Sequence, residues 1–171
     1  IQGSGVRELF ADTEVRLRII TRFNLRDFYD GVSDLAALEF LLARGSEIKG
    51  VRNLHAKVYV FDSSRAIVTS ANLTQAALRR NPEFGLETSN ADLVSAARSY
   101  FETLWKLATP CVTAKHLAKW RKTIAKIQLR GGAVKLNGEL GDYGADLGFI
   151  RHPSETDHKS AAATQWFVKF F

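Results

Sequence analysis

The sequence contains no methionine and only one cysteine, Cys111, among its 171 residues. A single cysteine excludes an internal disulfide and any zinc site built from several thiolates. Because position 1 is Ile1 and not methionine, we expect the chain to be a trimmed piece of a longer protein. We also expect an intracellular, cytoplasmic setting, since disulfide-rich frameworks are typical of secreted domains.

Long apolar runs are also missing. No stretch approaches the roughly 18 consecutive apolar residues that a membrane-spanning helix needs, and no charged leader precedes an apolar segment as in a signal peptide. Hydrophobic residues make up 46% of the chain and charged residues 25%, which is typical of globular domains. The net charge of +6 favours a polyanionic partner, either nucleic acid or an anionic membrane surface.

Strands and helices are predicted to alternate over residues 1–109. β-branched and apolar patterns predict strands at 15–21, 47–51, 57–61, 66–69 and 84–88. Helical spacing predicts helices at 34–44, 72–80 and 91–107, the first capped by Ser33 and ended by Gly45. Apolar residues on both faces of 57–61 predict a central strand. The alternation indicates an α/β domain with layers of helix and sheet.

Pro110 interrupts this pattern. Beyond it, residues 114–129 are predicted to form a helix with an apolar stripe and a basic remainder. Residues 131–165 are rich in Gly, Ser, Asp and Ala and are predicted to be mostly loop. We therefore predict a catalytic domain over 1–109. Over 110–171 we predict a basic helix followed by the start of a truncated C-terminal extension or second domain.

Four polar residues lie at or just beyond the adjacent ends of two neighbouring predicted strands: His55, Lys57, Ser70 and Asn72. Successive strand residues point to opposite faces, so each pair shares a face if its strand extends that far. An imidazole, an ammonium, a hydroxyl and an amide at one spot suit a phosphate group. Surface decoration of a strand is the simpler interpretation, however, and the residues alone do not identify a reaction.

The spacing His55-x-Lys57-x4-Asp62, followed by Ser70-x-Asn72 and Asn81-x-Glu83, resembles the signature of the phospholipase D superfamily. The resemblance implies a phospholipase D-like layered fold, in which a mixed β-sheet is flanked by helices, here with a small C-terminal extension. Members usually carry glycine directly before the serine, where this chain has Thr69. A side chain there is expected to reshape the pocket slightly, because glycine allows close approach of the backbone to a ligand.

The resemblance also implies a role for each residue of the signature. His55 would attack phosphorus and form a phosphohistidine. Lys57 and Asn72 would hold the non-bridging oxygens, with a supporting hydrogen bond from Ser70. Glu83 would accept a hydrogen bond from the other nitrogen of His55 and fix its tautomer.

Asp62, although part of the catalytic signature, is expected to be more structural than catalytic. No metal or cofactor is required by this scheme, because Lys57 and the corresponding lysine of a second copy of the motif supply the positive charge. The remaining histidines, His116, His152 and His158, form no recognisable ligand cluster with carboxylates at the usual spacings.

The chain carries one copy of the motif, whereas the family's chemistry needs a second histidine to protonate the leaving alcohol and then activate water. A symmetric homodimer with the active site on its two-fold axis is the economical interpretation. The alternative is a second copy of the motif elsewhere in a longer protein.

The superfamily includes lipases, phosphatidyl transferases and endonucleases, so the fold does not choose the substrate. Single-motif members resemble nucleases more often, and the basic helix could follow a phosphate backbone through Lys115, Lys119, Lys122 and Lys126. We therefore predict a metal-independent DNA endonuclease of restriction type that does not act at a membrane. The alternatives are a phospholipase or phosphatidyl transferase, and a non-catalytic DNA-binding module; a solvated helix face would equally explain the lysines.

Overall fold

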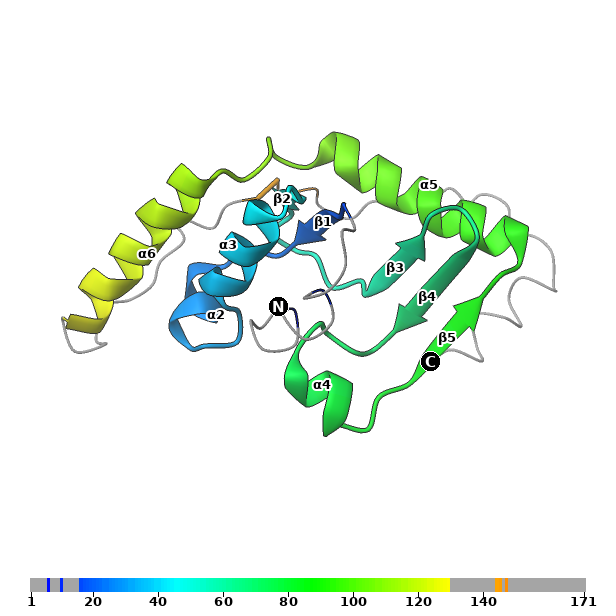
Figure 1. The fold of residues 1–171 in the computed structure, drawn as a ribbon, viewed down its shortest axis with the longest axis horizontal. Coiled ribbons are helices and arrows are strands. Elements are labelled where there is room, and N and C mark those ends of the chain that lie inside the picture. The colour runs from blue at the N-terminus through cyan, green and yellow to red at the C-terminus, as the bar shows by residue number, and fades with distance from the viewer. Residues whose placement is uncertain (1–5, 7–9, 11–15, 130–143, 146, 148–171) are drawn as a thin grey trace.

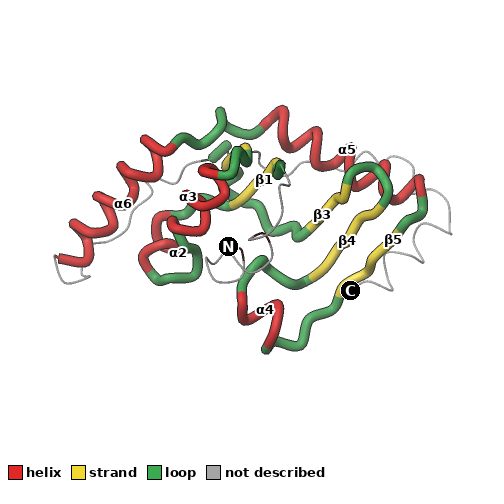
Figure 2. The backbone as a smooth tube through the Cα atoms, viewed as in Figure 1, coloured by secondary structure: helices red, strands yellow, loops and turns green. Residues whose placement is uncertain are grey.

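The computed structural model describes residues 6, 10, 16–129, 144, 145 and 147 (Figure 1). The loop predicted over 131–165 and the C-terminal extension therefore lie almost entirely outside the described residues. Helices, strands and loops of the described part are separated by colour in Figure 2. The α/β class is confirmed: helices flank strands that divide into two sheets.

The first sheet is a parallel pair. β1 (Arg18–Thr21) lies beside β2 (Glu47–Gly50), with Ile19 opposite Ile48. Parallel neighbours need a long crossover connection, which is supplied here by two helices, α2 (Leu25–Tyr29) and α3 (Leu35–Ala43). The side chains buried between these elements form the core, which includes Phe23, Leu38, Leu41 and Ile48.

The second sheet is antiparallel, in the order β3-β4-β5. It consists of β3 (Val58–Phe61), β4 (Arg65–Thr69) and β5 (Gly85–Thr88), and α4 (Gln75–Arg79) lies between β4 and β5 in the chain. The prediction that β3 is central was wrong for the part of the chain that the structure describes, because β4 holds that position. An apolar run indicates that both faces of a strand are covered by other parts of the protein. It does not indicate whether both edges of the strand pair with neighbouring strands, which is what makes a strand central.

Two helix starts also differ from prediction. The N-cap of α3 is Asp34, whose side chain accepts a hydrogen bond from the Ala36 amide at 2.8 Å, whereas Ser33 was predicted. The helix predicted over 72–80 begins only at Gln75, because Thr74 caps it by accepting from the Ala77 amide. Ser, Thr, Asp and Asn are all preferred as N-cap residues. The residue type alone therefore does not show which of two adjacent candidates, such as Ser33 and Asp34, caps the helix.

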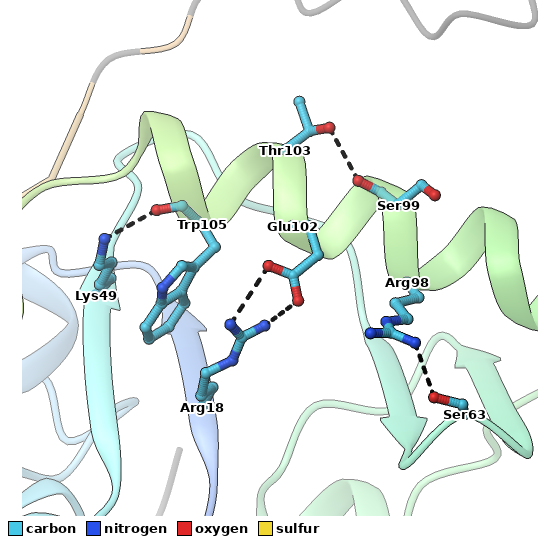
Figure 3. A network of polar contacts seen from close by, with 8 residues as sticks. All are labelled: Arg18, Lys49, Ser63, Arg98, Ser99, Glu102, Thr103 and Trp105. Atoms are coloured by element: carbon cyan, nitrogen blue, oxygen red, sulfur yellow. Dashed lines mark hydrogen bonds and ion pairs between the residues drawn. The ribbon is translucent and has the colours of Figure 1, made fainter.

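α5 (Ala91–Leu107) runs along both sheets (Figure 1). At its C-terminal end the Arg18 guanidinium of β1 lies over the rings of Phe101 and Trp105, 5.0 and 4.9 Å from their centroids. Arg18 also pairs with Glu102 (Figure 3). Lys49 of β2 donates to the Trp105 carbonyl at 2.9 Å.

The middle of the same helix contacts the second sheet. Arg98 donates to the Ser63 hydroxyl at 2.9 Å, in the turn between β3 and β4 (Figure 3). α5 therefore connects two sheets that share no strand among the described residues.

α6 (Ala114–Leu129) packs on α2 and α3 through the predicted apolar stripe, and all four of its members are buried: Leu117, Trp120, Ile124 and Ile127. These side chains join the core that the first sheet and its helices build. The predicted bounds of α6, 114–129, match the observed ones. The domain boundary at 109/110 stays a prediction.

Candidate active site

His55 lies on the segment that leaves the parallel sheet and enters the antiparallel one, between β2 and β3. Its side chain is exposed, and its Nε2 lies 3.1 Å from Nζ of the half-buried Lys57. A lysine ammonium can only donate hydrogen bonds, so the contact fits the imidazole tautomer that carries its proton on Nδ1. The pair thus places an imidazole nitrogen and a lysine side chain side by side on the surface.

Pairing between the strands continues beyond their assigned ends and includes the predicted site residues. The Thr69 amide donates to the Lys57 carbonyl at 3.1 Å, and the Ser70 amide donates to the Phe84 carbonyl at 2.9 Å. Lys57, Thr69 and Gly85 consequently form one row across the sheet. This pairing places Lys57 opposite Thr69, one residue before Ser70. Because successive strand residues point to opposite faces, the predicted convergence of Lys57 with Ser70 and Asn72 stays a prediction.

Ser70 connects that segment to the residues before β5. Its hydroxyl donates to Glu83 Oε2 at 2.5 Å and accepts from the Phe84 amide at 3.1 Å. The other carboxylate oxygen of Glu83 accepts from the Asn81 side chain at 3.5 Å. Glu83 therefore contacts Ser70 and Asn81 in this structure, and its predicted hydrogen bond to His55 stays a prediction.

Asn72 is exposed just beyond β4. Its carbonyl accepts from the Thr74 amide at 2.7 Å, while its side-chain amide makes no hydrogen bond within the described part of the chain. Tyr59 supports the same segment by donating to the Ala71 carbonyl at 3.3 Å. Burial raises the pKa of Tyr59 above its usual 10.0, so the hydroxyl keeps its proton and this hydrogen bond at neutral pH.

Asp62 lies in the turn at the far end of β3, and the structure does not bring it to His55 or Lys57. Five residues of extended chain separate Asp62 from Lys57, roughly 16 Å. Its backbone φ of 53° lies in the left-handed region.

The lysines predicted to bind substrate are likewise apart from the site. Lys115, Lys119, Lys122 and Lys126 are exposed on α6, which lies at the end of the molecule opposite the antiparallel sheet (Figure 1). The structure therefore presents them as a separate basic surface on α6.

The described residues contain neither a metal-binding cluster nor a membrane-spanning helix. No group of three or more His, Cys, Asp or Glu side chains in the described ranges is arranged to hold a metal ion, and His152 and His158 fall outside those ranges. Within the same ranges, no helix has both the length and the apolar character needed to cross a membrane.

The sequence interpretation missed the part that Thr69 and Gly85 play. The Thr69 hydroxyl donates to the Phe84 carbonyl at 3.0 Å and accepts from the Ala71 amide at 3.1 Å, so it lies within the site's own hydrogen bonds. The available signal was Gly85, because a glycine inside a strand often marks close approach of another group.

Comparison with known proteins agrees with the motif. A family model described as cardiolipin synthase, PLD-like domain, matches residues 6–105, more than half of the chain. No curated protein matches the sequence. Among solved structures, a phospholipase D family member, Nuc from Salmonella typhimurium, is similar at 15% identity and a TM-score of 0.41, covering 59% of this chain and 84% of its own. On the match to the family model, the chain belongs to the phospholipase D-like family.

Proposed function

We propose that the protein is a phosphodiesterase that cleaves DNA through a phosphohistidine formed on His55. The observation that carries this proposal is the 3.1 Å contact between His55 Nε2 and Lys57 Nζ on an exposed surface. It combines a nucleophilic lone pair with a cation that can move to a phosphate oxygen, which are the two requirements for attack on a phosphodiester.

In the first step, the Nε2 lone pair of His55 attacks phosphorus and the P–O bond to the leaving alcohol breaks. Lys57 moves from Nε2 to a non-bridging oxygen, and the side-chain amide of Asn72 donates to the same phosphoryl group, so both stabilise the charge of the transition state. The leaving oxygen takes a proton from a second histidine. In the second step that histidine deprotonates a water, which attacks phosphorus and releases His55.

A second histidine is needed, and the sequence holds one copy of the motif. We infer that a second copy of this chain supplies it across a two-fold axis, so that the half-sites of the two subunits exchange roles. Sedimentation of the purified protein is expected to give a dimer, and a strict monomer that still cleaves would contradict this arrangement.

The choice of DNA is supported by the net charge of +6 and by the exposed lysines of α6. A restriction-type endonuclease remains our more specific proposal. This scheme needs no metal ion, because Lys57 provides the positive charge.

A lipid phosphodiesterase is the second candidate. The description of the matching family names cardiolipin synthase, and the antiparallel sheet exposes the large apolar side chains of Phe61 at 43%, Val68 at 51% and Leu86 at 41%, with Phe84 at 74% just before β5. However, Val68 pairs with Val58, and Lys57 is one residue away from Val58, so strand alternation turns Lys57 to the opposite face. An apolar surface on the face opposite Lys57 favours a lipid substrate less than one beside His55 and Lys57 would.

Cleavage of supercoiled plasmid in the presence of a chelator tests the proposal. Wild type is expected to nick or cut the plasmid, whereas His55→Ala and Lys57→Ala are expected to lose activity by about a hundredfold or more. Lys106→Ala, at an exposed position in the last turn of α5, is the matched control for loss of one surface cation. Cleavage that survives in a folded His55→Ala variant would remove the mechanism, and head-group release from phosphatidylglycerol vesicles without DNA cleavage would select the lipid candidate.

A further inference from the structure

Thr69 and Gly85 face each other across β4 and β5. A Cβ atom placed on Gly85 would lie 2.8 Å from both Cβ and Oγ1 of Thr69 and 3.2 Å from the Val68 carbonyl oxygen. Non-bonded carbon atoms are normally in contact at about 3.5–4.0 Å, so any side chain at position 85 would displace Thr69. The threonine side chain thus occupies space that only a glycine leaves open.

The hydroxyl of Thr69 has two backbone partners in this position. It donates to the Phe84 carbonyl at 3.0 Å and accepts from the Ala71 amide at 3.1 Å. The first hydrogen bond holds the end of β4 against the residue before β5. The second fixes the course of the chain between Ser70 and Asn72, where β4 has ended and no strand pairing directs it.

The other side of Thr69 is occupied by the catalytic lysine. Because the Thr69 amide donates to the Lys57 carbonyl at 3.1 Å, Thr69 lies directly between Lys57 and Gly85 in the row across the sheet. A displacement of Thr69 away from Gly85 would therefore move it toward Lys57, and it would also shift the segment that carries Asn72.

We propose that Thr69 is a positioning residue, which sets the Ser70–Asn72 segment relative to Lys57, and that Gly85 is its obligatory partner. Related chains usually have glycine before the serine; here that position carries a side chain, and the glycine that accommodates it lies on the neighbouring strand. The proposal rests on the proposed function only for its activity readout.

Two substitutions at Thr69 distinguish the role of its hydroxyl from the role of the space that its side chain fills. Thr69→Val keeps the shape but removes both hydrogen bonds, whereas Thr69→Ser keeps the hydroxyl. On plasmid, kcat of Thr69→Val is expected to fall about tenfold or more with little change in KM, since a small misplacement of a group that acts in the transition state is costly. Thr69→Ser is expected to stay within about threefold of wild type, because the hydroxyl is retained. Equal kcat values in the two variants would overturn the proposal.

A second measurement does not depend on cleavage. Gly85→Ala is expected to lower the melting temperature when residue 69 is threonine, and to lower it much less in the Thr69→Gly background, where the space is free. The two changes are therefore expected to be non-additive in a double-mutant cycle. Additive effects would show that Thr69 and Gly85 are not a matched pair.

If wild type cleaves neither DNA nor lipid, the proposed function fails and amide exchange at Ala71 decides the positioning role. Faster exchange of the Ala71 amide in Thr69→Val than in Thr69→Ser supports the hydrogen bond as the device that orders the segment. Equal exchange in both variants would overturn it.

Discussion

Asp62 illustrates how a residue of a catalytic signature can be explained by backbone geometry. Among the described residues it is the one non-glycine with a positive φ, 53°, and it begins the turn between β3 and β4. Most side chains disfavour this region, whereas aspartate and asparagine are several-fold enriched there. Backbone geometry thus explains the residue type at this position, while the expectation that Asp62 is more structural than catalytic stays a prediction.

Substitutions at Asp62 separate the two roles. Asp62→Gly is expected to retain both cleavage and the free energy of unfolding, because glycine adopts a positive φ without strain. Asp62→Val is expected to lower the free energy of unfolding by about 1–2 kcal/mol, since a β-branched side chain is strained there. Urea denaturation and the plasmid assay measure these effects, and a folded Asp62→Gly variant without cleavage would assign Asp62 to the chemistry.

How far the site could be predicted depended on how local each contact is. The His55–Lys57 contact follows from two residues on one extended segment, so the alternation of side chains was sufficient. The partner of Glu83 was not predictable in this way. Glu83 meets Ser70 because β4 and β5 pair in a particular register, and register depends on the turn and the packed faces rather than on the motif.

Among the elements, α6 shows the strongest link between pattern and packing. Trp120 is 8% exposed, and its ring meets Phe23 and Phe28 edge-on, with centroids 5.2 and 5.5 Å apart. Edge-to-face aromatic pairs at this separation add to the stabilisation from buried area. The helix therefore contributes to the core beside the parallel sheet.

Truncation of this ring tests that contribution. Trp120→Ala is expected to lower the free energy of unfolding by about 3–5 kcal/mol, the usual cost of removing a large buried aromatic side chain. Lys119→Ala, on the exposed side of the same helix, is expected to change it by less than about 0.5 kcal/mol. Urea denaturation followed by circular dichroism compares the two, and similar small effects would mean that α6 is an appendage rather than part of the core.

The elements differ in how much their own sequence decides. α5 and α6 have one clear apolar stripe each, and the bounds of both were predicted to the residue. Within the described residues, the neighbours of β3 and the division of five strands into two sheets were not predicted, because pairing joins segments that are distant in the sequence. Local periodicity carries information about burial and little about partners.

For the whole molecule, the distribution of charge decides how a polyanion could bind. The four lysines lie on α6, whereas the His55–Lys57 pair lies on the segment that leads into β3, and α6 and β3 are well separated in the fold (Figure 1). A DNA duplex that contacts both must span the part of the molecule between α6 and β3. The lysines would then contribute phosphate contacts remote from the cleaved bond, which raise affinity without affecting the chemical step.

Neutralising this surface is expected to change the salt dependence of binding. If Lys115, Lys119, Lys122 and Lys126 each contact a phosphate, changing all four to Gln is expected to reduce the slope of log Kd against log salt by about 3 to 4. Fluorescence anisotropy of labelled DNA across a salt series measures the slope, with His55→Ala as a control that is expected to bind like wild type. An unchanged slope would mean that these lysines form only a solvated helix face.

The position of α5 across both sheets has a consequence for folding cooperativity. Arg18 and Lys49 hold one end of the helix to the parallel sheet, and Arg98 holds its middle to the antiparallel one. Two sheets joined only by the segment around His55 would be free to open separately. With a shared helix, opening of either sheet removes packing partners from the other, so the slowest-exchanging amides of β2 and β4 should report one common opening free energy.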